Sequence, residues 1–145
     1  MDLIIGIGNR LRRDDGIGPT VVESLSDQPG VECYVVQQLT PDLAQGLCEA
    51  ERVLFVDAAI DGNEPHLDRV AAEATRGLGH ALPPAGLLDL ADRLYGNAPP
   101  AWLLTVPGCD FRFGETLSPA AIARLPEARR HIGAWLEAGS APVRT

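Results

Sequence analysis

Short apolar runs alternate with amphipathic stretches along most of the chain. Runs such as Leu3–Ile7 and Val53–Val56 are continuous and rich in β-branched residues, which is typical of strands that are covered on both faces. Between these runs, apolar residues recur at the spacing of one helix face, as in 84–95. The pattern predicts strands at 2–7, 31–36, 52–57, 67–72 and 101–106, and helices at 16–27, 40–51, 84–95 and from 119 onward.

Several element boundaries carry their own chemical signals. Thr40 and Ser118 each stand directly before a proline, and this pair is typical of an N-cap followed by the first helical position. Gly96 follows the helix 84–95 and is expected to end it. Pro126 lies inside the last helical region, where a missing N–H and a ring clash predict that it divides the helix.

The alternation of strands and helices predicts an α/β fold. Such a pattern is typical of a three-layer domain, with a mainly parallel sheet, here of about five strands, and helices on both faces. The length of 145 residues fits a single domain spanning 1–145. The segment 139–145 is expected to be a frayed tail.

Composition narrows the classes of partner. The chain carries 20 acidic and 12 basic residues, a net charge of −8, so a nucleic acid is an unfavourable partner. No apolar run approaches the roughly 18 residues of a membrane span, and the N-terminus lacks the basic region of a signal peptide. The cysteines are Cys33, Cys48 and Cys109, a set that forms neither a disulfide framework nor a zinc cluster. We therefore expect the reducing cytoplasm as the location, and the size of the chain is sufficient for a monomer.

Three reactive side chains are expected at one edge of this sheet. Ligands of open α/β sheets bind beyond the carboxyl ends of the strands. Asp15 follows the first strand, Asp57 ends the strand 52–57, and His80 follows the strand 67–72. Two carboxylates and an imidazole suit divalent ions such as zinc, nickel, cobalt or manganese. Three protein ligands would leave open positions for water or a substrate group.

The first loop partly imitates a nucleotide-binding motif. Residues 6–11 begin like the dinucleotide fingerprint, but Leu11 stands where that motif requires its third glycine. Asp14 and Asp15 lie near the start of the following helix, where their charge would repel a phosphate. A nucleotide-binding α/β domain is therefore the weaker alternative.

Structural roles compete with functional ones at each candidate. Asp15 could cap the first helix, Asp57 could be a hydrogen-bonding residue at a strand end, and His80 could be an exposed loop residue. Asp14 could be a helix cap, a partner of the site or a surface charge. Asn9 is suited to shaping the turn, with substrate contact as the alternative.

The remaining polar candidates favour ordinary roles. Cys109 has no dedicated base in the sequence to make it a nucleophile. We expect His66 to be solvated and His131 to be structural. The arginines of the first loop are either solvated or grip an acidic part of a partner; they are Arg10, Arg12 and Arg13.

Motifs in order along the chain resemble one known family. The segment Gly6–Gly18 is similar to the N-terminal signature of the hydrogenase maturation proteases, which mature nickel-iron hydrogenases. The resemblance runs from residue 3 to about residue 135, nearly the whole domain. Its later motifs are Val53–Ala58, Gly79–Pro84 with Leu87-Leu88, Leu94–Gly96, Thr105–Gly108 and Phe113–Ser118.

The resemblance implies an endopeptidase that is neither a serine nor a cysteine protease. It would remove the C-terminal peptide of the hydrogenase large subunit once nickel has been inserted. Carried over by motif, Asp15, Asp57 and His80 would recognise the nickel, which arrives with the substrate. Some members have Glu where Asp15 stands, and Gly79 replaces a serine of many members.

The resemblance leaves the chemistry of the cut open. The nickel could be only a recognition tag or also a Lewis acid on the scissile carbonyl. One carboxylate could instead act as general base on water. A module that docks on the large subunit without cutting it would use the same motifs, and it is the alternative from another functional class.

Overall fold

The computed structural model describes residues 1–75 and 82–139. Its strands are β1 (Asp2–Ile7), β2 (Val31–Val36), β3 (Arg52–Ala59), β4 (His66–Val70) and β5 (Ala101–Pro107). Its α-helices are α1 (Ile17–Glu23), α2 (Ala44–Glu49), α3 (Pro84–Tyr95) and α4 (Pro119–Ala138), with short 3-10 turns η1 (Arg13–Gly16) and η2 (Pro41–Leu43) before α1 and α2. None of the described helices is long and apolar enough to cross a membrane.

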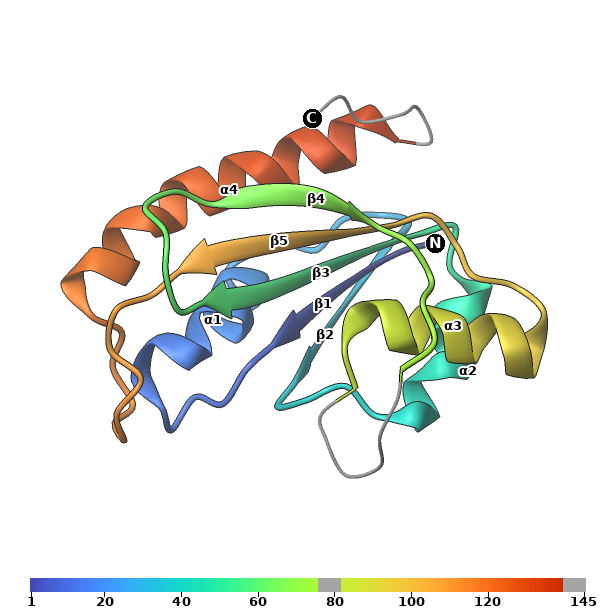
Figure 1. Cartoon of the computed structure of the whole chain (residues 1–145). Helices are drawn as coiled ribbons and strands as arrows, with labels where there is room; N and C mark the ends of the chain where they lie inside the picture. The colour runs from blue at the N-terminus through green and yellow to red at the C-terminus, as the bar shows by residue number, and fades with distance from the viewer. Residues whose placement is uncertain (76–81, 140–145) are drawn as a thin grey trace.

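The five strands form one sheet in the order β2-β1-β3-β5-β4. Strands β2, β1, β3 and β5 are parallel, whereas β4 pairs antiparallel with β5. The helices α1 and α4 cover one face and α2 and α3 cover the other, as Figure 1 shows. The predicted α/β class, with a mainly parallel sheet between two helical layers, is confirmed.

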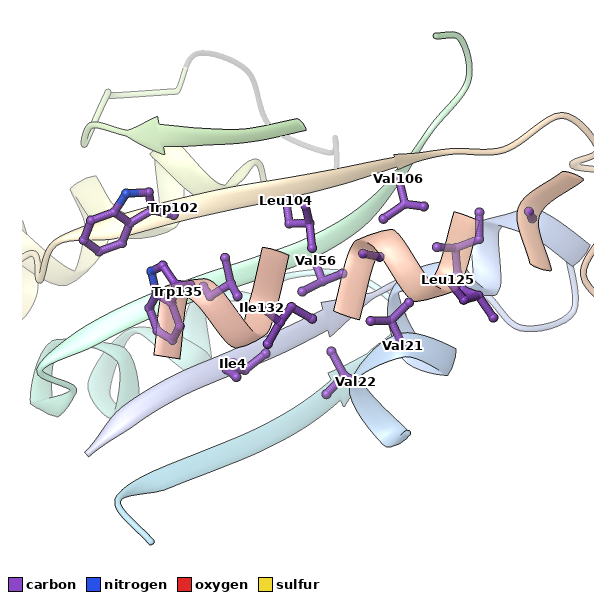
Figure 2. Packing of buried hydrophobic residues seen from close by; sticks show 14 residues of the cluster. Ile4, Val21, Val22, Val56, Trp102, Leu104, Val106, Leu125, Ile132 and Trp135 are labelled. Carbon is purple, nitrogen blue, oxygen red and sulfur yellow. The ribbon is translucent and has the colours of Figure 1, made fainter. Parts of the chain in front are cut away.

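Alternate residues of the central strands supply two separate cores. Ile4 and Val56 point to the α1 and α4 side, while Ile5 and Phe55 point to the α2 and α3 side. This two-sided burial explains why β1 and β3 are continuous apolar runs. Figure 2 shows the first core, with Ile132 and Trp135 of α4 packed toward the sheet. Trp135 meets Trp102 of β5 edge to face, with ring centroids 5.9 Å apart.

The prediction that Pro126 divides the last helix is wrong. The helix α4 continues through Pro126 from Pro119 to Ala138. Interior proline costs about 3 kcal/mol, but buried residues on both sides of it pack on the same face of the sheet. These are Ala121 and Leu125 before it, and Ala128, Ile132 and Trp135 after it. Their packing keeps the helix continuous through Pro126.

The strand predicted at 67–72 has the opposite direction to the others. β4 begins at His66, not Leu67, and ends at Val70. The connection from β3 spans only 60–65 and contains Gly62 and Pro65. A parallel neighbour needs a crossover of a dozen or more residues, so a link this short permits only an antiparallel return. Other bounds also differ: α1 ends at Glu23 and α2 at Glu49, while β3 continues past Asp57 to Ala59 and β5 to Pro107.

Candidate functional site

A cavity of about 330 Å³ lies at the carboxyl edge of the parallel strands. It holds two carboxylates, Asp15 from the turn after β1 and Asp57 from the last three residues of β3. The strands β1 and β3 are neighbours in the sheet, so their ends bring these side chains together. The predicted meeting of Asp15 and Asp57 at one edge is confirmed. The cavity is lined by Ile7, Gly8, Asp15, Gln37, Gln38, Leu39, Asp57, Leu82, Pro83 and Pro84.

Close backbone packing holds Asp15 over the strand ends. Gly8 has φ +154°, and a Cβ there would overlap the carbonyl oxygen of Asp15. A Cβ on Gly18 would overlap the carbonyl oxygen of Val56. Glycine is therefore required at both positions for the turn and α1 to lie against β1 and β3. Gly8 and Gly18 thus permit this close approach.

Asn9 fixes the orientation of the Asp15 carboxylate. The Asn9 backbone N–H donates to Asp15 Oδ2 at 2.7 Å. The Asn9 side-chain oxygen accepts from the Leu11 N–H at 2.9 Å, which closes a turn of the kind that asparagine favours. The prediction that Asn9 shapes this turn is confirmed.

Asp57 is a half-buried carboxylate that forms no ion pair with any side chain in the described part of the chain. Its Oδ1 accepts from the neighbouring Ala58 N–H at 2.8 Å. Burial raises the pKa of Asp57 to about 6; the Ala58 hydrogen bond opposes this rise, and the negative charge of Asp15 adds to it. No arginine in the described part of the chain forms an ion pair with either carboxylate. Two such carboxylates at one cavity attract a cation.

Asp14 has a different role from its neighbour Asp15. Its side chain is 0% exposed and accepts hydrogen bonds from the N–H groups of Cys109, Asp110 and Ser118, at 2.8, 3.0 and 2.7 Å, and from the Ser118 hydroxyl at 2.7 Å. Burial favours the neutral acid, but these hydrogen bonds outweigh it and hold the pKa of Asp14 below its ordinary value. Asp14 is thus neither a surface charge nor a cap of α1, which has no side-chain cap. It fastens the segment before α4 to the first loop.

His80 lies outside the described residues. The end of β4 does not lie at the carboxyl edge as predicted, because β4 is antiparallel and its last residue, Val70, lies opposite Ala101 at the start of β5. The chain after β4 nevertheless comes back to the α3 region, where the Glu73 N–H donates to the Ala85 carbonyl at 3.0 Å. The described residues directly after the gap, Leu82–Pro84, line the cavity with Asp15 and Asp57.

The remaining sequence candidates lie away from the two carboxylates or are already engaged. His66 is exposed on β4, as predicted. Cys109 is exposed, and its thiol lies 3.2 Å from the Ser118 hydroxyl oxygen, which also caps α4. Arg13 donates to Asp110 at 2.6 Å and to the Thr116 carbonyl at 3.1 Å. Arg13 therefore connects two loops through hydrogen bonds and is not a solvated side chain.

Three residues of the cavity are absent from the prediction made from the sequence. Gln37, Gln38 and Leu39 follow β2 directly and line the cavity beside Asp15. The rule that drew attention to the carboxyl ends of strands applies to β2 as well. Their amide side chains carry no charge, so they were not considered.

The described residues supply two of the three expected metal ligands. No group of three or more His, Cys, Asp or Glu side chains suited to a metal occurs within 1–75 and 82–139. The pair Asp15 and Asp57 offers carboxylate oxygens only. Carboxylates fit a divalent cation, and a nitrogen ligand is needed to make the set suitable for nickel or zinc.

Solved structures share this architecture over nearly the whole chain. The hydrogenase maturating endopeptidase HybD from Escherichia coli superposes with a TM-score of 0.72 at 22% identity, covering 95% of this chain and 93% of that one. The NiFe hydrogenase maturation protease HycI from Thermococcus kodakarensis gives 0.71 at 22% identity, covering 94% and 92%. The chain has the hydrogenase maturation protease fold.

A third structure extends this similarity to another organism. The hydrogenase 2 maturation peptidase from a Thaumarchaeota archaeon gives a TM-score of 0.66 at 24% identity, covering 94% of this chain and 97% of that one. No family model and no curated protein matches the sequence. The shared property of these chains is therefore the hydrogenase maturation protease fold, which this chain covers almost from end to end.

Proposed function

We propose that this protein is an endopeptidase that removes the C-terminal peptide of the nickel-iron hydrogenase large-subunit precursor after nickel insertion. One observation carries the proposal: two carboxylates, Asp15 and Asp57, line one cavity in a fold shared with named hydrogenase maturation proteases, and neither is ion-paired with a described residue. The motifs in 3–135 support the same assignment. The proposal places the reaction in the cytoplasm, which suits three unpaired cysteines, and takes the monomer as the active form.

In this proposal, Asp15, Asp57 and His80 bind the nickel that the precursor carries. The carboxylates supply two oxygen ligands and the imidazole supplies the nitrogen that completes a nickel set. The same three residues are the proposed catalytic residues. A cation held there would polarise a nearby carbonyl; in the alternative, one of the carboxylates would act as general base on water.

The decisive experiment compares nickel-loaded and nickel-free precursor in one processing assay. The proposal expects a loss of mass at the C-terminus only with the loaded form, and many turnovers for each molecule of enzyme. Binding of the loaded precursor without any cut would contradict the endopeptidase and favour a docking module. Absence of both binding and cleavage would refute both readings.

A matched pair of histidine variants tests the proposed site. His80→Ala is expected to abolish processing, because the nickel set loses its only nitrogen ligand. His66→Ala is the control, since His66 is exposed on β4 and does not line the cavity. Thermal unfolding of both variants shows whether the fold is retained. Full processing by a folded His80→Ala protein would remove His80 from the site.

A further inference from the structure

One margin of the sheet is an open strand. β2 pairs along all six of its residues with β1, and no other described strand pairs with it. Figure 1 shows β2 beside β1 at this margin. Four consecutive residues, Glu32–Val35, are exposed, and they include Tyr34, which is 50% exposed. Exposed edge strands are templates for pairing with another chain unless the protein covers them.

The hydrogen bonds at the two ends of β2 show which backbone groups face outward. The Gly30 carbonyl accepts from Asp2 N–H at 2.8 Å, and the Val36 carbonyl accepts from Gly8 N–H at 3.0 Å. The N–H and C=O of alternate residues point to opposite sides of a strand. Even-numbered residues of β2 therefore face β1, and Cys33 and Val35 turn their N–H and C=O groups to the open side.

These outward groups form a continuous unpaired edge. Within 1–75 and 82–139, no backbone or side-chain acceptor takes the N–H of Cys33 or Val35. The Val31 N–H is already used, since it donates to the Gln28 carbonyl at 3.3 Å. An added strand can thus pair with β2 through Cys33 and Val35 without displacing a bond that the described structure contains.

The open edge leads into the cavity of the two carboxylates. β2 ends at Val36, and the next residues, Gln37–Leu39, line the cavity with Asp15 and Asp57. Six strand residues span roughly 20 Å. A chain whose scissile bond lies in the cavity can therefore continue along the whole of β2, toward the amino end of the sheet.

A second hollow lies beside the amino half of this edge. It measures about 380 Å³ and is lined by Met1, Asp2, Leu3, Glu32, Tyr34, Gly46, Glu49 and Ala50. Asp2 is ion-paired with Arg52, whereas Glu32 and Glu49 form no ion pair among the described residues. The Tyr34 hydroxyl donates to Glu32 at 3.0 Å. The Met1 amino group at this hollow is paired with Glu51, so two carboxylates that form no ion pair among the described residues favour a basic side chain there.

We propose that the open edge of β2 binds the C-terminal extension of the precursor as an added strand. This rests on the proposed function, which puts the scissile bond in the cavity. Because the extension begins at the cavity and continues down the sheet, it runs antiparallel to β2. Alternate side chains of an added strand share one face, so a lysine or arginine of the extension meets Glu32 and Glu49. Backbone pairing supplies affinity and this basic side chain supplies specificity.

The first test removes a single outward N–H. Cys33→Pro deletes the donor, and proline is tolerated on an edge strand where its N–H faces solvent. Cys33→Ala is the matched control, because it loses the same thiol but keeps the N–H. With nickel-loaded precursor, we expect KM to rise about tenfold for Cys33→Pro, the worth of one hydrogen bond. Cys33→Ala is expected to keep the wild-type KM, and kcat is expected to stay unchanged in both.

A second measurement tests the proposal even if β2 does not tolerate a proline at position 33. A synthetic peptide with the sequence of the extension is expected to bind the wild-type protein, and Glu32→Arg is expected to weaken that binding about tenfold. N-methylation of the peptide, one residue at a time, is expected to weaken binding at every second position, since only alternate N–H groups face β2. Equal effects at successive positions would refute the added strand.

The outcomes separate this proposal from the proposed function. A wild-type protein that cleaves the precursor, together with an unchanged KM for folded Cys33→Pro, would overturn the edge proposal alone. If the wild type does not cleave, the proposed function fails, and peptide binding by the wild type and Cys33→Pro decides the edge. A wild-type dimer that Cys33→Pro converts to a monomer would show that a second copy occupies the edge, which also overturns the proposal.

Discussion

The carboxylates at the two ends of the central sheet differ in their ion pairing among the described residues. At the amino end, Asp2 of β1 accepts from Arg52 Nε at 3.1 Å and from a second guanidinium nitrogen at 2.5 Å. Arg52 lies 3.9 Å from the ring centroid of Trp135 and donates to its carbonyl at 2.8 Å. At the carboxyl end of the same two strands, Asp15 and Asp57 share a cavity without a described counter-charge.

This difference separates a structural charge from one that is available for binding. The Asp2–Arg52 pair is bidentate and packed against an aromatic ring, so its charges are neutralised within the fold. Asp57 instead has its pKa raised to about 6 by burial, which means that the folded protein disfavours its charged form. A carboxylate kept in that condition lowers stability, and a bound cation relieves the cost.

The largest expected effect is at the carboxyl end. Asp57→Asn keeps the shape of the side chain but removes its charge and its capacity to accept a proton. We expect processing of nickel-loaded precursor to fall on the order of 1000-fold, without loss of stability. The measurement is kcat/KM together with urea unfolding. Near-normal processing would mean that Asp57 is a strand-end residue of the kind that Asp2 represents.

The amino end is expected to respond in stability and not in processing. Arg52→Met keeps an unbranched apolar stem over Trp135 but leaves Asp2 without its partner. We expect the free energy of unfolding to fall by about 3 kcal/mol, as measured in urea, while kcat/KM at 25 °C stays within twofold of wild type. A large fall in kcat/KM for a fully folded Arg52→Met protein would contradict the separation of the two ends.

The pH dependence of the free energy of unfolding tests whether Asp57 is a carboxylate with a raised pKa. The pKa of Asp57 is about 6 in the folded protein against an ordinary 3.8. Between these values the folded state keeps a proton that the unfolded state has lost, so the free energy of unfolding decreases as pH rises from 4 to 6 and levels off above 6. Relative to Asp57→Asn, the wild type is expected to lose about 2 kcal/mol over this range. Parallel curves for the two proteins would show that Asp57 is not shifted.

The smallest effect is expected at a charged pair on the surface. Arg10 and Glu23 form an ion pair whose side chains are 47% and 53% exposed. Solvent screens such pairs, so Glu23→Gln should change the free energy of unfolding by less than about 1 kcal/mol and leave processing unchanged. Chemical denaturation in low and high salt checks this. A larger loss would mean that the first loop, which holds Asp15, depends on this pair.

Local patterns were sufficient for most elements. The strands at 2–7 and 31–36 and the helix 84–95 have the predicted bounds, because apolar period and terminal signals such as Gly96 act within a few residues. Pro126 shows the limit of this reasoning, since its local preference is outweighed by buried contacts on either side. The direction of β4 was open to inference, because the length of the link 60–65 was visible in the sequence.

In the candidate site, too, some features were predictable from the sequence and others were not. Asp15 and Asp57 were predicted to meet, because the carboxyl ends of parallel strands share one edge, and both line the cavity. Asp14 has the same chemical identity as its neighbour, and the sequence offered no means to distinguish them. Its hydrogen-bond partners lie 95 to 104 positions away.

The sequence by itself determined the layers, the parallel core and the edge at which two carboxylates meet, since these follow from hydrophobic period and from strand direction. Only the tertiary structure decided that Asp14 is buried and fully hydrogen-bonded, that Asp57 has no counter-charge among the described residues, and that β2 leaves an open edge leading into the cavity. The physical reason is that solvation and hydrogen bonding of a side chain depend on neighbours that are distant along the chain, and no local pattern specifies them.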